Sequence, residues 1–260
     1  MSGPRRGPAS PDAPGQGSTE RPDPVELPAP RPSGRGGARR THRAPRCNGC
    51  GLHVPLCVCA DVVPRPTRSR VVVVTLPVEA RKTTSSARLL LRALPACDVR
   101  LRGAAGAPTP LDDLAAPARR PVLLYPMPGV PVLDAAWVAS DPRPVTLVVP
   151  DGNWRQARRL VRPREPVLSA LPKVRLLPGP PSRFELRSHP DPARLSTFEA
   201  VARALEVLEG PEAGPPLRAA LERTFEAWVD RALFARGRGR RFGESGPRPH
   251  DEDEGHDDGP

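Results

Sequence analysis

The sequence predicts an α/β fold with a mainly parallel sheet. Three short apolar runs predict buried strands at residues 71–76, 122–125 and 145–149. None of these runs alternates with polar residues, which is typical of strands covered on both faces. Helical patterns lie between and after them, at residues 87–94, 154–161, 196–209 and 217–235. Strands that alternate with helices indicate a parallel sheet.

Two of the helices have clear local signals. The helix at residues 196–209 begins at Ser196, which can cap a backbone N–H, and Glu199 can return the bond as a capping box. The last helix is amphipathic, because large apolar residues recur on one stripe of it. That stripe contains Leu217, Leu221, Phe225, Trp228 and Ala232.

The two ends of the chain have the composition of disordered tails. Residues 1–45 and 237–260 are dominated by Pro, Gly, Arg, Ser and acidic residues and show almost no apolar periodicity. Such segments bury too little surface to offset the entropy of ordering. We therefore expect one folded domain at residues 46–236, which is long enough for a single core.

The predicted domain is basic. Nine arginines stand against four acidic residues before residue 47, a net +5, and four arginines stand against seven acids from residue 237, a net −3. The middle of the chain therefore carries +9 of the total +11. A basic surface suits a nucleic-acid partner. Lysine occurs only at Lys82 and Lys173, so a GC-rich genome explains the excess of arginine equally well.

Targeting signals are absent from the sequence. No run of about 18 apolar residues occurs, which argues against a membrane span, and the N-terminus lacks the apolar segment of a signal peptide. We therefore expect a cytoplasmic protein, in which cysteines stay reduced and closely spaced cysteines more often bind metal than each other.

Four cysteines lie within thirteen residues: Cys47, Cys50, Cys57 and Cys59. Four thiolates in a C-x-x-C and C-x-C arrangement favour a structural zinc site with no open position. We expect this zinc module at residues 46–62. Two disulfides are the alternative, although a bridge between Cys57 and Cys59 would close a very tight ring. His53 lies inside the loop and could replace one ligand, and Cys97 is expected to be a buried apolar residue.

The third predicted strand runs into Asp151-Gly-Asn-Trp154. Ligands of parallel sheets bind outside the carboxyl ends of the strands, so Asp151 stands where chemistry is expected. Asp151 could equally be the N-cap of the following helix. Trp154 can stack on a base, although a tryptophan at the start of a helix more often packs in the core.

The order of five motifs resembles the DTW-domain family over about residues 46–235. That family consists of tRNA-uridine aminocarboxypropyltransferases with a SPOUT-like α/β fold, and the resemblance implies a C-terminal knot. Two positions depart from the family pattern: Asn153 stands where the family usually has Thr, and Leu76 where it usually has His. The motifs are Cys47-x-x-Cys50, Cys57-x-Cys59, Leu76-Pro-Val-Glu79, Asp151-Gly-Asn-Trp154 and Leu195-Ser-Thr-Phe-Glu-Ala200.

The resemblance implies a reaction in which N3 of a tRNA uridine attacks the γ-carbon of S-adenosylmethionine and methylthioadenosine leaves. Asp151 is the expected base, with Glu79 as the second catalytic candidate. The residues expected to bind S-adenosylmethionine are Leu124, Tyr125, Pro126, Pro150, Gly152, Trp154, Leu195, Ser196 and Thr197.

Arginines are the expected contacts to RNA phosphates, because a guanidinium group can bind a phosphate through two hydrogen bonds. The candidates are grouped near the strand ends. They are Arg81, Arg88, Arg155, Arg158 and Arg187. Two other functions remain open: a SPOUT-type RNA methyltransferase, and a non-catalytic zinc-containing RNA-binding module. The sequence leaves the oligomeric state open, with a monomer as one reading.

Overall fold

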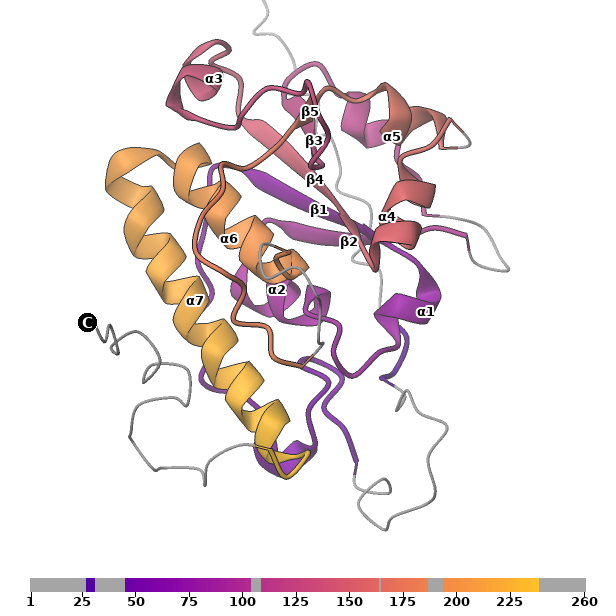
Figure 1. Cartoon of the computed structure of the whole chain (residues 1–260), viewed down its shortest axis with the longest axis vertical. Coiled ribbons are helices and arrows are strands. Elements are labelled where there is room, and N and C mark those ends of the chain that lie inside the picture. Colours follow the sequence, from indigo (N-terminus) through magenta and orange to yellow (C-terminus); the bar gives the residue numbers. More distant parts are fainter. Residues whose placement is uncertain (1–26, 31–44, 104–108, 164, 187–193, 239–260) are drawn as a thin grey trace, which may run out of the picture.

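The computed structural model describes residues 27–30, 45–103, 109–163, 165–186 and 194–238. The predicted tails lie outside the described residues, apart from residues 27–30, 45, 237 and 238. A five-stranded parallel sheet, in the order β2-β1-β4-β3-β5, forms the centre of the domain (Figure 1). The α/β fold with a parallel sheet is therefore confirmed. Its strands are β1 (Arg70–Thr75), β2 (Cys97–Leu101), β3 (Arg120–Leu124), β4 (Val145–Asp151) and β5 (Lys173–Val174).

Three strands match the predicted apolar runs, and two were not predicted. β2 was missed because the charged residues Asp98 and Arg100 interrupt its apolar pattern. Both face an ion-pair network at the edge of the sheet, in which Asp98 binds Arg70 at 2.7 Å. β5 is only two residues long, which is too short for any periodicity to show.

Helices cover both faces of the sheet (Figure 1). One face packs against α2 (Ala87–Ala93), α6 (Thr197–Leu208) and α7 (Gly210–Phe234), and the other against α4 (Trp154–Leu160) and α5 (Pro166–Ala170). Alternate residues of β1 point to opposite faces: Val71 and Val73 lie in the first core, and Val72 and Val74 in the second. The remaining short helices are η2 (Val54–Leu56), α1 (Pro77–Ala80), η3 (Asp112–Ala115) and α3 (Ala135–Ala139).

The C-terminal helix begins seven residues before its predicted start, at Gly210 rather than residue 217. Pro215 and Pro216 hid this extension, because proline inside a helix removes a hydrogen bond. α6 and α7 cross closely at Gly214, where an added Cβ would lie 1.9 Å from the carbonyl oxygen of Glu206. The pair is held further along by aromatic contacts, with the rings of Phe198 and Phe225 stacked 5.0 Å apart.

No helix among the described residues is both long and apolar enough to cross a membrane. The described strand order does not test the predicted knot, which stays a prediction together with the SPOUT-like relationship.

Candidate active site and metal site

Asp151 is the last residue of β4 and lies beside Thr75, the last residue of β1, in the parallel register. Both of its carboxylate oxygens accept hydrogen bonds from threonine hydroxyls. Thr75 Oγ1 donates to Oδ2 at 2.9 Å, and Thr197 Oγ1 donates to Oδ1 at 2.5 Å. The Asp151 residue is 8% exposed. The two hydroxyl donors fix the orientation of this carboxylate at the carboxyl edge of the sheet.

The helix that follows is capped by Asn153, not by Asp151. Asn153 Oδ1 accepts from the backbone N–H of Gln156 at 3.0 Å, and Gln156 Oε1 accepts from the N–H of Asn153 at 2.7 Å. This capping box leaves Asp151 free of the capping role that the sequence allowed. It also explains why Asn can stand where the family has Thr, since both residue types are good N-caps.

Gly152 makes the tight turn between the strand and the helix. Its φ of +139° is rarely adopted by residues with a side chain. An added Cβ would lie 3.0 Å from both Cβ and Oε1 of Gln156, and 3.4 Å from Cγ of Glu79. Glycine is therefore required here both for backbone conformation and for space.

Glu79, on α1, is 1% exposed and belongs to the same cluster. Its Oε1 accepts a hydrogen bond of 2.8 Å from Gln156 Nε2 and a second from Lys82 Nζ. Gln156 thus connects Glu79 to the turn that carries Asp151. With its ammonium and amide partners, Glu79 holds the turn in place.

Sequence reasoning missed two residues of this site, Thr75 and Gln156. Thr75 is the one hydroxyl residue at the end of a run of valines, and a polar residue that ends a buried strand was the available signal. Gln156 stands three residues after Asn153, at the capping-box spacing, which was a second usable signal.

The residues expected to bind S-adenosylmethionine come from the ends of β3 and β4 and from the start of α6. The rings of Tyr125 and Trp154 lie 6.0 Å apart, and the Arg194 guanidinium lies 4.9 Å from the Trp154 ring centre. Because parallel strands end at one edge, these aromatic rings share that edge with Asp151. Trp154 is half-buried against the second core, so packing accounts for part of its role.

The other predicted contacts differ in how accessible they are. Leu124 and Ser196 are buried, Pro150, Gly152, Leu195 and Thr197 are half-buried, and Pro126 is exposed. Ser196 caps α6 in the predicted capping box, with its Oγ accepting from the N–H of Glu199 at 3.2 Å. Its hydroxyl is thereby engaged, whereas the neighbouring hydroxyl of Thr197 serves Asp151.

The four clustered cysteines form a site that could hold a metal ion. Their sulfur atoms all lie within 4.8 Å of one another. The Sγ atoms of Cys47 and Cys59 are 3.6 Å apart, and those of Cys50 and Cys57 are 3.7 Å apart. Tetrahedral zinc with Zn–S bonds of about 2.3 Å places sulfurs about 3.8 Å apart. Disulfide bonds are excluded at these distances, and all five cysteines are free thiols, with Cys97 buried as expected.

The chemistry of the thiols also suits a metal. Burial works to raise the pKa of the Cys47 thiol, but hydrogen bonds, first that from the backbone of Cys50, lower it to about 7. Burial raises the pKa of the Cys50 thiol to about 11 and raises that of Cys59 further. A bound cation would stabilise the thiolate form of all four. His53, in contrast, is not among the residues whose ligand atoms cluster in the described part of the chain.

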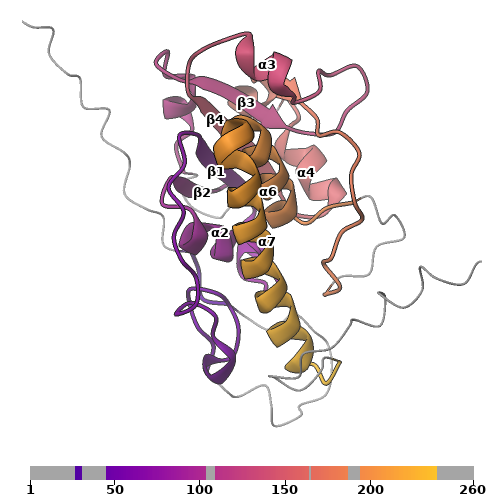
Figure 2. The ribbon, with the colours of Figure 1, turned by 90° about the vertical axis from the view of Figure 1, so that its left-hand side faces the viewer.

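Side chains from two helices, α7 and α2, anchor this cysteine loop to the domain. Trp228 Nε1 donates to the carbonyl of Cys50 at 2.8 Å, and Arg231 Nη1 donates to that of Cys57 at 2.6 Å. Both come from α7, the long helix at the front of the domain in Figure 2. Arg88 Nη1 donates to the carbonyl of Asn48 at 3.0 Å.

The expected RNA contact at Arg88 is therefore wrong. Its side chain is buried, at 2% exposure, and also binds the carbonyl of Ala80 at 2.8 Å. Burial lowers the pKa of Arg88, while its attraction to Cys47 and Cys50 opposes that effect. Arg88 holds the cysteine loop against α2 and cannot reach a phosphate. Arg81, Arg155 and Arg158 are exposed as predicted, and Arg187 lies outside the described residues.

Comparison with known proteins identifies the family of this chain. The chain matches the DTW domain over residues 44–233. It is 29% identical over 174 residues to tRNA-uridine aminocarboxypropyltransferase 2 of Mus musculus, covering 64% of this chain and 57% of that protein. It is 30% identical over 189 residues to the protein of the same name from Drosophila melanogaster, covering 70% of this chain and 72% of that protein.

Among solved structures, the chain is similar to the SAM-dependent rRNA:acp-transferase Tsr3 from Vulcanisaeta distributa. The identity is 21%, covering 62% of this chain and 82% of that one, and the TM-score is 0.32, which is too low to establish a common fold. The match to the DTW domain extends over most of the chain and includes the cysteine cluster and the Asp151 turn. The chain belongs to the DTW domain family.

Proposed function

We propose that this protein is a tRNA-uridine aminocarboxypropyltransferase. It transfers the 3-amino-3-carboxypropyl group of S-adenosylmethionine to N3 of a tRNA uridine and releases methylthioadenosine. The relatives of the same family carry that name, although the alignment spans only 57% of the mouse protein. The observation that carries the proposal is the buried carboxylate of Asp151, held by hydrogen bonds from Thr75 and Thr197 at the carboxyl edge of the sheet.

This arrangement suits the chemistry of the transfer. Uridine N3 carries a proton that must leave as the new N3–Cγ bond forms. The Cγ–S bond breaks with its electron pair going to sulfur, so the leaving group needs no proton. Asp151 accepts the N3 proton, because it is a carboxylate at the carboxyl edge of the sheet whose orientation is fixed by two threonine hydroxyls. Its negative charge also lies where it can stabilise the sulfonium of the bound donor.

The residues around Asp151 hold the turn that carries it and orient the substrates. Glu79, Gln156 and Lys82 fix the turn, as their hydrogen bonds show. Tyr125 and Trp154 offer an aromatic surface for the adenine or uracil ring. Arg81, Arg155 and Arg158 are exposed cations for the RNA backbone.

We further propose that the cysteine site holds structural zinc. Four thiolates leave no open position for a substrate, and a zinc ion there would fix the loop on α7 and α2. A cytoplasmic location, where tRNA and S-adenosylmethionine are both present, belongs to the same proposal.

Product analysis tests the reaction. Purified protein is incubated with S-adenosylmethionine and unmodified tRNA, and the nucleosides and small molecules are analysed by mass spectrometry. We expect 3-amino-3-carboxypropyl uridine and an equal amount of methylthioadenosine. Release of S-adenosylhomocysteine with a methylated nucleoside would identify a methyltransferase instead. Binding of tRNA without binding of S-adenosylmethionine would identify a non-catalytic RNA-binding module.

A further inference from the structure

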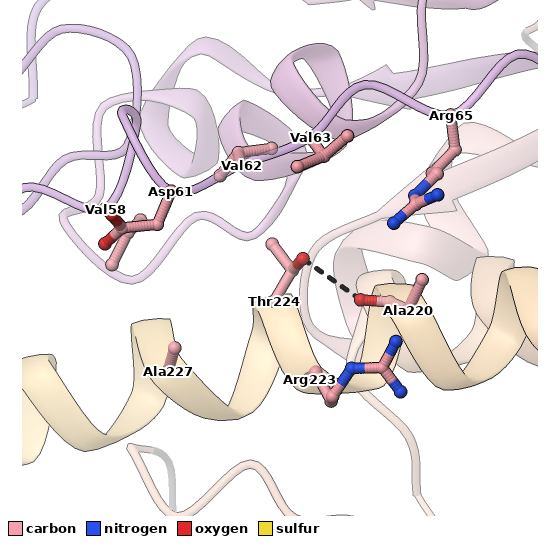
Figure 3. Close-up of a pocket in the computed structure, with 9 residues that line it drawn as sticks. All are labelled: Val58, Asp61, Val62, Val63, Arg65, Ala220, Arg223, Thr224 and Ala227. Carbon is pink, nitrogen blue, oxygen red and sulfur yellow. Dashed lines mark hydrogen bonds between the residues drawn. The ribbon is translucent and has the colours of Figure 1, made fainter.

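A groove of about 240 Å³ lies between α7 and the segment that leads from the cysteine loop to β1 (Figure 3). One wall is formed by the segment and the other by one face of α7. Figure 3 shows Arg65 reaching from the segment toward α7, and the Arg223 guanidinium lying beside Ala220 on the facing helix. The lining residues are Val58, Asp61, Val62, Val63, Arg65, Ala220, Arg223, Thr224 and Ala227.

The charges in this groove are unbalanced. Asp61 is the one acidic residue in the lining, and its carboxylate already binds Arg231 at 2.6 Å. Neither Arg65 nor Arg223 has a side-chain hydrogen bond or ion pair within the described part of the chain. Most other arginines near the core are paired, as Arg218 is with Glu206 at 2.6 Å. The groove therefore has two uncommitted cations and no uncommitted anion.

Two guanidinium groups on opposite walls suit a phosphate, which can accept hydrogen bonds from both at once. Apart from Asp61 and Thr224, the rest of the lining is apolar, with Val63 59% exposed. The apolar part of the groove suits the ribose of a nucleotide, and the two arginines suit its phosphate. The Thr224 hydroxyl donates to the carbonyl oxygen of Ala220 at 3.1 Å. The two arginines are therefore the side chains that can donate hydrogen bonds to a ligand.

The groove and Asp151 lie at opposite ends of β1. Arg65 comes before the first residue of that strand, Arg70, and Asp151 pairs with its last residue, Thr75. At about 3.3 Å per residue, β1 is roughly 17 Å long. A single nucleotide cannot occupy both places, whereas an RNA chain can contact both.

We propose that this groove binds a phosphate of the substrate RNA backbone, at a distance from the reacting uridine. The inference rests on the proposed function for the identity of the ligand as RNA. The segment 60–69 connects the cysteine loop to the strand that positions Asp151, so RNA held in the groove contacts the part of the domain that the metal site anchors. The interaction contributes to RNA affinity and leaves the chemical step unchanged.

The salt dependence of tRNA binding tests the groove. The logarithm of the association constant is measured against the logarithm of salt concentration for the full chain and for the double variant Arg65→Ala/Arg223→Ala. We expect affinity to fall and the slope to decrease by about one, the effect of losing one phosphate contact. Arg223→Lys keeps the charge and should keep the slope. Arg143→Ala is the matched control, because it removes an exposed arginine that is already paired with Asp141.

Two outcomes would overturn the inference. A double variant with an unchanged slope and affinity would show that the groove does not contact RNA. Calorimetry with inorganic phosphate tests whether the ligand is a free anion. If phosphate binding is lost in the double variant while the salt slope of tRNA binding is unchanged, the groove binds a free anion and not RNA. Both measurements report binding, so they remain informative if product analysis shows a different reaction.

Discussion

Thr75 Oγ1 donates a 2.9 Å hydrogen bond to Asp151 Oδ2 between the last residues of two neighbouring parallel strands. Thr75 is fully buried, so its hydroxyl has little access to water. The bond fixes the direction of the carboxylate and stabilises its charged form. In the proposed reaction, Thr75 is thus a positioning residue that acts through Asp151.

Replacing Thr75 by Val removes the hydroxyl and keeps the branched shape. We expect kcat/KM to fall roughly tenfold, as for the loss of a hydrogen bond to a charged group. The acid limb of the pH profile should move to higher pH, because the ionised carboxylate has lost a donor. Thr75→Ser keeps the donor and should restore the wild-type profile. A Val variant with less activity but an unmoved profile would indicate a purely structural role.

Replacing Gly152 by Ala should disturb the turn that carries Asp151. Gly129, with a φ of +79° and no described atom within 4 Å of its added Cβ, is a matched control for backbone strain alone. We expect Gly129→Ala to lower the free energy of unfolding by about 1 kcal/mol. Gly152→Ala should cost more and reduce transfer, because its Cβ displaces Gln156. Equal effects of the two variants in thermal unfolding and in activity would contradict this account.

Asn153→Thr restores the residue that is usual in the family. Threonine caps helices nearly as well as asparagine, so we expect stability and activity to remain close to wild type. Asn153→Ala removes the cap and should lower the free energy of unfolding by about 1 kcal/mol. Chemical denaturation measures both. A large loss of activity in the Thr variant would show that Asn153 has a role in the substrate site beyond capping.

The elements that the sequence predicted well have strong local signals. The valine run of β1 and the capping box at Ser196 depend on neighbouring residues, and both are confirmed. β2 and the start of α7 were missed because tertiary packing decides them. Asp98 and Arg100 are neutralised by partners from other elements, and the first part of α7 packs closely against α6 at Gly214.

In the candidate site, too, the sequence predicted the feature that depends on neighbouring residues and missed those that depend on tertiary contacts. The position of Asp151 at the end of a strand followed from the apolar run before it. The partners of that carboxylate did not, since Thr75 and Thr197 are 76 and 46 residues away in the chain. The prediction for Arg88 failed for a related reason. An arginine is usually exposed, whereas the carbonyl partners of Arg88 come from the folded cysteine loop and from α1.

Metal binding by the four cysteines should release protons. Burial raises the pKa of the Cys50 thiol to about 11, so this thiol is protonated in the metal-free protein at neutral pH. A metal ion requires the thiolate, so zinc affinity should rise with pH and fall on acidification. Titration of zinc into metal-free protein in a weak buffer with a pH indicator measures the release. Cys50→Ser should release fewer protons and hold zinc less tightly, whereas Cys97→Ser, outside the cluster, should retain its zinc.

The sharpest test concerns Asp151 itself. Asp151→Asn keeps the size of the side chain and removes its charge, and helix capping is not at stake because Asn153 caps α4. We expect normal folding, near-normal binding of S-adenosylmethionine and tRNA, and transfer slower by roughly two to four orders of magnitude, the usual contribution of a positioned proton acceptor. Glu79→Gln is the matched control, because Glu79 is equally buried and is bound by Gln156 and Lys82. Its loss should lower stability more than it lowers the rate per folded molecule. Single-turnover rates and unfolding curves for both variants separate the two roles, and an Asp151→Asn enzyme with full activity would rule out Asp151 as the base.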